Sequence, residues 1–307
     1  MDYSSILLNN LDKAAPIILV LLGYFLKRTG AVKKEAADHL INLVFYVFLP
    51  ASIFHSLLIL QITNELLLLP LAGFVISLSC YLLGYAMAGF LGMNRKTTGT
   101  FLIACGSTNQ GLFSYPFFLM YLGTQGLSYV AFYDMGQIIL IFTLAYYFAI
   151  KYGEREAGIS HIVRKMLSSP VLWAFAFALG INVSGLTQAV APIEPVITML
   201  HNSTIPLVMI ALGIFVEPRI RHAKAMAAAI FVRFGYALAA AYIVVLAFNL
   251  QGPERLTALA ASTVPPAMFT LVYSVEEGLD VEYASALLSV CVAIGLVYTP
   301  LLFSLLL

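Results

Sequence analysis

The chain of 307 residues is 61% hydrophobic and only 10% charged, whereas soluble domains carry about 25% charged residues. That much apolar surface exceeds what a water-soluble core can bury, so the sequence predicts a multi-pass protein of the cell membrane. The net charge of +1 at pH 7 argues against a nucleic-acid partner, because nucleic-acid-binding surfaces are strongly basic.

Ten apolar segments have the length, about 20 residues, that a helix needs to cross a bilayer. Their predicted bounds in chain order are 11–27, 37–60, 66–91, 98–121, 127–151, 168–186, 195–216, 224–249, 255–275 and 283–306. The sequence therefore predicts an all-α membrane protein with ten transmembrane helices, surrounded by the lipid bilayer.

Lysine and arginine residues gather on one side of these predicted helices. They follow the first, third, fifth and seventh spans, whereas the other side carries only Lys13 and Arg255 near its helix ends. Cytoplasmic loops are enriched in Lys and Arg, so we expect the basic side to be cytoplasmic and both termini to be extracytoplasmic. The acidic loop at 276–282 is expected on the basic side too, and it weighs little because acidic residues contribute little to this rule.

Prolines recur at an almost constant offset in corresponding helices of the two halves. The pairs are Pro16 and Pro170, Pro50 and Pro206, and Pro116 and Pro266, which lie 154, 156 and 150 positions apart. This spacing favours a duplicated five-helix unit at 1–152, a short cytoplasmic connector at 153–166, and a second copy at 167–307. An odd number of crossings places the second copy upside down, as an inverted repeat. The alternative is a chance recurrence among 13 prolines.

Polar, helix-breaking stretches interrupt the fourth and the ninth predicted spans. Backbone that leaves the helical ladder inside a membrane must be satisfied by protein or by a water-lined cavity. Matched interruptions in two halves are typical of a transporter's substrate site. The residues expected to line such a site are Thr108, Asn109, Gln110, Gly111, Ser114, Pro116, Ser262, Thr263, Pro265 and Pro266. The alternative is a kinked helix pair whose polar groups only satisfy one another.

The chemistry of these interruptions suits a small anion. A broken helix exposes unpaired N–H groups and a partial positive charge at its N-terminal end, which can bind a carboxylate without a Lys or Arg. The amide of Asn109 offers two hydrogens to donate and an oxygen to accept. We expect Ser262 and Thr263 to approach from the other side, and Pro265 and Pro266 to leave a carbonyl of the preceding turn unpaired.

Two ionisable residues fall inside predicted spans, where charge is costly and often functional. Asp134 lies in the fifth span, with Gln137 one helical turn further on. It either carries a coupling proton or holds the fourth helix through hydrogen bonds. Arg233 lies in the eighth span. It either snorkels or pairs structurally, or it compensates the charge of a substrate.

Other function classes find little support. Neither His55 nor His201 has a second ligand at metal-binding spacing, and the three cysteines are interpreted as small core residues. The sequence contains no HExxH or GxSxG motif, no paired intramembrane Asp and no Gly-rich phosphate loop. We therefore expect neither an enzyme nor an ATP-driven pump, with no metal and no cofactor.

Several motifs together resemble a known family. The stretch 109–116 reads Asn-Gln-Gly-Leu-Phe-Ser-Tyr-Pro, and polar or proline motifs follow at 132–137, 205–213 and 264–267. Their order and spacing resemble the auxin efflux carrier family, which includes the plant PIN proteins and whose fourth helix carries Asn-x-Gly-x-x-Gly-x-Pro. Ser114 replaces the usual Gly of that signature, which we expect to narrow the crossing.

The resemblance implies a fold similar to sodium/proton antiporters and bile-acid transporters. Helices 1, 2, 6 and 7 would form a scaffold, and helices 3–5 and 8–10 a mobile transport domain in which broken helices 4 and 9 cross. It also implies elevator-type transport of small organic anions, auxin-like acids or malate- and malonate-like dicarboxylates, and a homodimer formed through the scaffold. A channel or a membrane sensor with the same fold remains the alternative.

Overall fold

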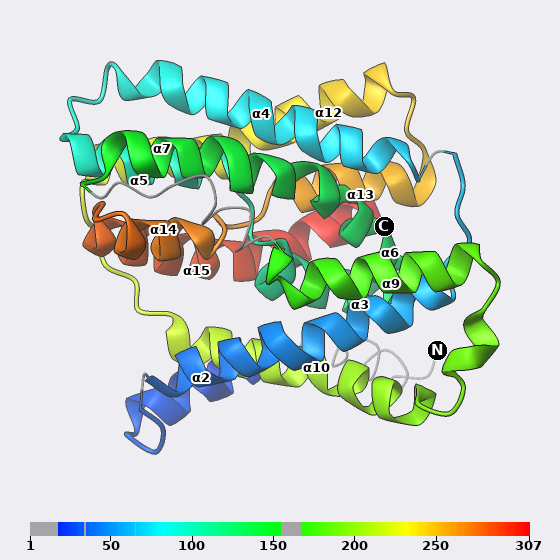
Figure 1. Cartoon of the computed structure of the whole chain (residues 1–307). Coiled ribbons are helices and arrows are strands. Elements are labelled where there is room, and N and C mark those ends of the chain that lie inside the picture. The colour runs from blue at the N-terminus through cyan, green and yellow to red at the C-terminus, as the bar shows by residue number, and fades with distance from the viewer. Residues whose placement is uncertain (1–17, 34, 65, 155–166) are drawn as a thin grey trace, which may run out of the picture. The chain divides into compact units, whose positions relative to one another are not determined.

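The computed structural model of the chain describes residues 18–33, 35–64, 66–154 and 167–307 (Figure 1). Regular secondary structure in these ranges is helical, and the extended pairing within them is one isolated bridge between Thr108 and Pro266. The predicted all-α class is therefore confirmed. The first predicted span, 11–27, lies partly outside the described residues, of which 18–28 are helical.

The helices follow the apolar segments closely. In chain order they are α2 (Glu35–Leu43), η1 (Val44–Phe48), α3 (Leu49–Leu58), α4 (Leu68–Ala88), α5 (Arg95–Gly106), η2 (Gln110–Ser114), α6 (Tyr115–Leu140), η3 (Ile141–Ala145), α7 (Tyr146–Tyr152), α9 (Pro170–Val183), η4 (Thr187–Val190), α10 (Glu194–Phe215), α11 (Ala223–Ile230), η5 (Phe231–Tyr236), α12 (Ala237–Ala247), α13 (Gly252–Ser262), α14 (Phe269–Glu276) and α15 (Val281–Leu306). Of the η segments, η4 is a 3₁₀ turn and the others are wider π turns, most of them continuous with their α neighbours.

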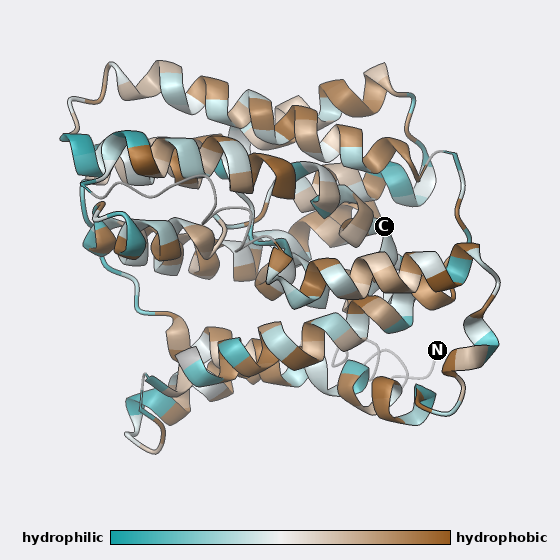
Figure 2. Cartoon of the chain, viewed as in Figure 1, coloured by the Kyte–Doolittle hydropathy of each residue, from teal (hydrophilic) through white to brown (hydrophobic). Residues whose placement is uncertain are grey.

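Six helices within the described residues are long and apolar enough to cross a membrane. They are Glu35–Leu58, Leu68–Ala88, Gln110–Tyr152, Glu194–Phe215, Ala223–Ala247 and Val281–Leu306. Hydrophobic residues run along them, while many hydrophilic residues lie at helix ends and loops (Figure 2). Side chains such as Phe231, Ile243 and Leu301 are 56%, 65% and 60% exposed, an apolar surface of the kind that lipid covers.

The count of six differs from the ten predicted spans for physical reasons. The interruptions shorten α5, α13 and α14 to 12, 11 and 8 residues, and α9 has 14. The 43-residue stretch Gln110–Tyr152 covers parts of two predicted spans. It contains Gly123 at φ 65° and ψ −160°, a conformation that is essentially restricted to glycine. The helical path therefore breaks there, and the arrangement of ten helices stays a prediction.

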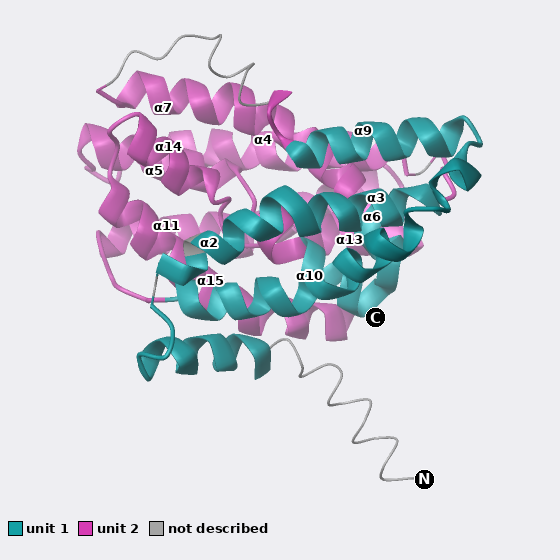
Figure 3. Cartoon of the chain, turned by 60° about the horizontal axis from the view of Figure 1, so that its bottom comes forward, with its two compact units in different colours: residues 1–60, 115–128, 170–216 teal, residues 61–114, 129–169, 217–307 magenta. Residues whose placement is uncertain are grey.

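The described residues divide into two compact units (Figure 3). The first comprises residues up to Leu60, Tyr115–Ser128 and Pro170–Val216. Within it α3 packs against α9 and α10. A Cβ added at Gly23 or at Gly213 would collide with a backbone carbonyl of the other helix, so helix 18–28 and α10 touch backbone to backbone.

The second unit comprises Gln61–Ser114, Tyr129–Ser169 and Glu217–Leu307. In it α4 lies beside α5 and α12 (Figure 1). A second glycine pair holds α4 against α6, because a Cβ at Gly73 would meet the carbonyl of Tyr133 and one at Gly136 would meet that of Pro70. The interrupted helices α5 and α13 both belong to this unit, so the candidate site between them lies within it.

Candidate functional site

Both predicted interruptions are real breaks in the helical backbone. Helix α5 ends at Gly106, the next residue is extended at φ −92° and ψ 136°, and helical backbone resumes at Gln110. Helix α13 ends at Ser262 and α14 begins at Phe269. Gly111 and Ser114, expected inside the first interruption, instead lie in the π turn η2 that follows it. Pro116 lies further on, in α6, and belongs to the first unit.

The two breaks lie side by side and pair with each other. The Asn109 amide donates to the Pro265 carbonyl at 2.8 Å, and the Ala267 amide donates to the Ser107 carbonyl at 3.2 Å. Thr108 and Pro266 face each other between these two bonds as an antiparallel bridge. The unwound backbone is thus partly satisfied by its counterpart, as buried polar backbone must be.

Proline does not leave the preceding carbonyls unpaired, contrary to our expectation. Pro265 and Pro266 have no N–H, so they cannot bond the carbonyls four residues earlier, those of Ala261 and Ser262. The Ala261 carbonyl instead accepts the side-chain amide of Gln110 at 2.7 Å, and the Ser262 carbonyl accepts the guanidinium of Arg233 at 2.5 Å. Two long polar side chains from other segments complete this helix end.

Gln137 clamps the first break. Its Oε1 accepts the backbone N–H of Thr108 at 3.0 Å and the Thr108 hydroxyl, and its Nε2 donates to the Thr108 carbonyl at 3.0 Å. Nε2 also donates to Oδ1 of Asp134 at 2.7 Å. Gln137 therefore pairs with Thr108 as a neighbouring strand would, and Asp134 orients the amide that does so. One of the two roles predicted for Asp134 was to hold the fourth helix through hydrogen bonds with Gln137 nearby. In the structure Gln137 makes the contacts with Thr108, and Asp134 bonds to Gln137.

Three side chains at the first break carry buried polar atoms that have no partner in the part of the chain that the structure describes. Asn109, Gln110 and Ser114 are 5%, 2% and 0% exposed. Asn109 Oδ1 accepts the Leu112 amide at 3.3 Å, and Gln110 Nε2 donates to the Thr108 hydroxyl at 2.8 Å. Within the described chain, Asn109 Nδ2, Gln110 Oε1 and Ser114 Oγ have no hydrogen-bond partner. The break therefore offers donors and an acceptor that are ready for a ligand or for water.

The second break presents its hydroxyls differently. Ser262 Oγ donates to the Leu259 carbonyl at 2.9 Å, and Thr263 Oγ1 lies 3.2 and 3.3 Å from the carbonyls of Leu259 and Ala260. Both hydroxyl hydrogens thus return to the last turn of α13. Such back-bonding is a common local alternative for Ser and Thr. Ser262 and Thr263 therefore donate within their own helix, and their contact with a ligand stays a prediction.

Arg233 does not snorkel to a helix end. Its side chain is 1% exposed, and the guanidinium donates to the carbonyls of Cys105, Ser262 and Val264. These acceptors lie at the ends of both broken helices. The sequence marked Arg233 only as a charge inside an apolar span and gave no indication that it reaches both breaks.

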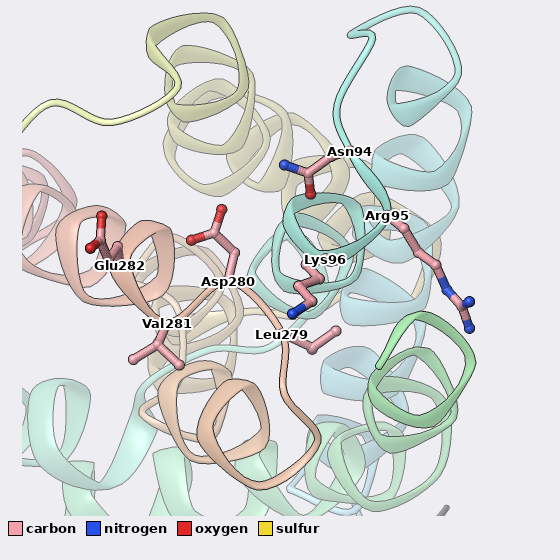
Figure 4. Close-up of a pocket in the computed structure, with 7 residues that line it drawn as sticks. All are labelled: Asn94, Arg95, Lys96, Leu279, Asp280, Val281 and Glu282. Atoms are coloured by element: carbon pink, nitrogen blue, oxygen red, sulfur yellow. The ribbon is translucent and has the colours of Figure 1, made fainter. Parts of the chain in front are cut away.

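A separate cavity of about 510 Å³ opens beside the N-termini of α5 and α15, lined by Asn94, Arg95, Lys96, Leu279, Asp280, Val281 and Glu282 (Figure 4). Its central polar groups cap helices. Asn94 accepts the Thr97 amide at 2.9 Å, and Asp280 accepts the Tyr283 amide at 3.0 Å and the Thr97 hydroxyl at 2.6 Å. This cavity shares no residue with the breaks. Among the described residues, no group of three or more His, Cys, Asp or Glu side chains could hold a metal ion.

Comparison with known proteins identifies the family of this chain. The family model described as "Membrane transport protein" matches residues 13–303. An uncharacterized transporter of Methanothermobacter thermautotrophicus is 29% identical over 292 residues, which are 93% of this chain and 94% of that protein. An uncharacterized transporter of Methanocaldococcus jannaschii is 29% identical over 281 residues, 87% of this chain and 88% of that protein. The chain therefore belongs to the membrane transport protein family, the auxin efflux carrier family that its motifs resemble.

Proposed function

We propose that this membrane transporter carries small organic anions, either auxin-like acids or malate- and malonate-like dicarboxylates. The observation that carries the proposal is a set of buried polar atoms on Asn109, Gln110 and Ser114, beside two facing helix breaks, that have no hydrogen-bond partner among the described residues. Leaving such atoms unsatisfied costs about 1–3 kcal/mol each. A ligand that accepts hydrogen bonds at the start of the half-helix after the break would recover that cost for Asn109 Nδ2 and Ser114 Oγ.

In this proposal a carboxylate accepts hydrogen bonds from Asn109 Nδ2 and Ser114 Oγ. The partial positive charge at the N-terminal end of the resumed helix stabilises the negative charge. Gln110 Oε1 is an acceptor, so it favours a hydroxyl or amine hydrogen elsewhere on the ligand. Gly111 leaves the backbone open to close approach, since it has no side chain.

We further propose ten membrane-spanning helices in two inverted five-helix repeats, 1–152 and 167–307, joined by the cytoplasmic connector 153–166. The two facing breaks support it, because they occur at corresponding places in the two halves. Cysteines introduced beside Leu307 should react with a membrane-impermeant reagent from outside, and cysteines in the connector only after permeabilisation. The reverse pattern would contradict this orientation.

The division into two units supports an elevator-type mechanism. The first unit contains helix 18–28, α2–α3, α9 and α10, which correspond to helices 1, 2, 6 and 7 of the expected scaffold. The second unit contains most of the expected transport domain. The stretch Tyr115–Ser128 groups with the first unit, which departs from the expected grouping. We propose that two copies associate through the scaffold helices.

The test combines binding with flux. Purified protein is heated in indole-3-acetate, malate or malonate, with and without sodium, because a ligand of the folded state raises the melting temperature by mass action. We expect at least one acid to stabilise the protein and to show saturable uptake into proteoliposomes. Asn109→Ala should lose the shift, and His55→Ala, in the first unit, should keep it. Uptake that never saturates would identify a channel, and no shift with no uptake would reject the proposal.

A further inference from the structure

Arg233 occupies an unusual place for a charged residue. It lies inside the continuous helical stretch Ala223–Ala247, which is long and apolar enough to span a membrane, and its side chain is 1% exposed. The helix widens there into the π turn η5, Phe231–Tyr236. Such single π turns occur frequently at functional sites. Charged residues within membrane spans are rare and usually have a functional role.

The guanidinium bonds to the carboxyl ends of both interrupted helices. Nη1 donates to the Cys105 carbonyl at 3.2 Å, in the last turn of α5. Nη2 donates to the Ser262 carbonyl at 2.5 Å, the last residue of α13, and Nε donates to the Val264 carbonyl at 3.3 Å, just beyond it. The planar fork of Arg suits this arrangement, since a Lys ammonium lacks its fixed set of donors.

No carboxylate of the described residues lies within salt-bridge distance of this guanidinium. A helix end carries a partial charge of about half an elementary charge, negative at the C-terminus and positive at the N-terminus. Four such ends meet at the two breaks, and on their own they would cancel. The positive charge of Arg233 offsets the two negative ends, whereas the Asp134 carboxyl at the first break accepts the Gln137 amide.

We propose that Arg233 is a positioning residue that holds the two breaks together and adds a positive charge at their carboxyl ends. This charge, rather than the breaks alone, makes the region between them prefer anions to cations and neutral molecules. The inference deepens the proposed function, because it names the residue that sets the charge class of the substrate. It also holds for any anion, whether or not an organic acid is transported.

The experiment measures the charge preference without a substrate. Asn109→Cys places a thiol at the first break, and its rate of modification is measured with an anionic sulfonatoethyl and a cationic trimethylammonioethyl methanethiosulfonate. The parent protein with only the native, buried Cys80, Cys105 and Cys291 gives the background. The ratio of the two rates is compared among four proteins that all carry Asn109→Cys. One has no further change, one adds Arg233→Gln, one adds Arg233→Lys, and one adds Arg255→Gln as the matched control. Arg255 is exposed on α13 in the same unit.

We expect the ratio to favour the anionic reagent and to fall by roughly a hundredfold or more in Arg233→Gln. A unit charge acting over about 10 Å at an effective dielectric of about 20 changes each rate by more than about tenfold, in opposite directions for the two reagents. Arg233→Lys keeps the charge and should keep the ratio, and Arg255→Gln should leave it unchanged. If Arg233→Gln does not fold, Arg233→Lys keeps the inference falsifiable, because a lost preference for the anionic reagent in a variant that retains the charge would overturn it. An unchanged ratio in Arg233→Gln, or an introduced thiol that reacts with neither reagent, would overturn the inference. A charge-dependent ratio in a protein that binds none of the tested acids would instead reject the organic-anion proposal alone.

Discussion

The two helix breaks face each other, yet they satisfy their polar groups in different ways. At the first break, Asn109, Gln110 and Ser114 keep buried polar atoms without a partner among the described residues. At the second break, the hydroxyls of Ser262 and Thr263 fold back onto their own helix. We infer that the first break supplies the side chains that select a ligand, and that the second supplies backbone that completes the fold.

The largest effect should come from the clamp on the first break. Gln137→Ala removes the partners of the Thr108 N–H, carbonyl and hydroxyl at once, and each buried group left unpaired costs about 1–3 kcal/mol. We expect a loss of about 3 kcal/mol or more of folding free energy, measured as a lower melting temperature. Thr257→Val, which deletes a local hydroxyl bond to the Pro253 carbonyl on α13, is the control. Equal losses of stability in the two variants would show that Gln137 stabilises the fold no more than an ordinary hydroxyl bond within a helix does.

Next in size is the loss of the Asn109 amide, which we propose binds the ligand. Asn109→Ala should weaken binding of the stabilising acid by about 1–3 kcal/mol, roughly 5- to 150-fold, as measured by calorimetry. Asn109→Asp should weaken it further, since two like charges repel. Stability should fall by less than in Gln137→Ala, because Asn109 Oδ1 gives up only its bond to the Leu112 amide. Unchanged affinity in Asn109→Ala would move ligand selection away from the first break.

A smaller change is expected at Asp134, whose Oδ1 accepts the side-chain amide of Gln137. Asp134→Asn keeps an acceptor oxygen for the Gln137 amide, so the clamp, the fold and the pH dependence of flux should persist. Asp134→Leu removes the acceptor and should cost about 1 kcal/mol of stability. The measurement is uptake into proteoliposomes across a range of pH values. Flux that loses its pH dependence in Asp134→Asn would assign the coupling proton to this carboxyl.

The smallest effect should come from the second break. Ser262→Ala and Thr263→Val delete hydroxyls whose hydrogen bonds return to carbonyls of the same helix. Affinity for the acid should change less than about twofold in calorimetry, and stability by about 0.5–1.5 kcal/mol. Should either variant weaken binding as much as Asn109→Ala, the two breaks would share ligand selection equally.

The positions of both breaks could be predicted because their causes are local in sequence. Consecutive prolines remove two backbone donors at Pro265 and Pro266, and the run of short polar residues at 107–109 competes for the backbone. The exchange of bonds between Asn109 and Pro265 could not be read from either segment alone. The Gln137 clamp and the Arg233 fork join groups 29 to 128 residues apart, so they depend on the tertiary packing of helices that sequence patterns leave open.

Hydroxyl orientation also could not be predicted from the sequence. Ser262 and Thr263 stand beside prolines in a break, and residue type does not distinguish a rotamer that faces a ligand from one that bonds three or four residues back. The count of ten helices stays a prediction. The gap that the sequence predicts between the fourth and fifth spans, 122–126, contains Gly123, where the backbone angles interrupt the helix.

The paired glycines have a mechanical consequence. Helix 18–28 meets α10 through Gly23 and Gly213, and α4 meets α6 through Gly73 and Gly136, in each case with backbone against backbone. Helices usually slide past one another by exchanging side-chain rotamers in small shear steps. These contacts contain no rotamers to exchange, so sliding would force one main chain through another. Each pair therefore fixes its two helices relative to each other, and any sliding between helices must occur outside these two contacts.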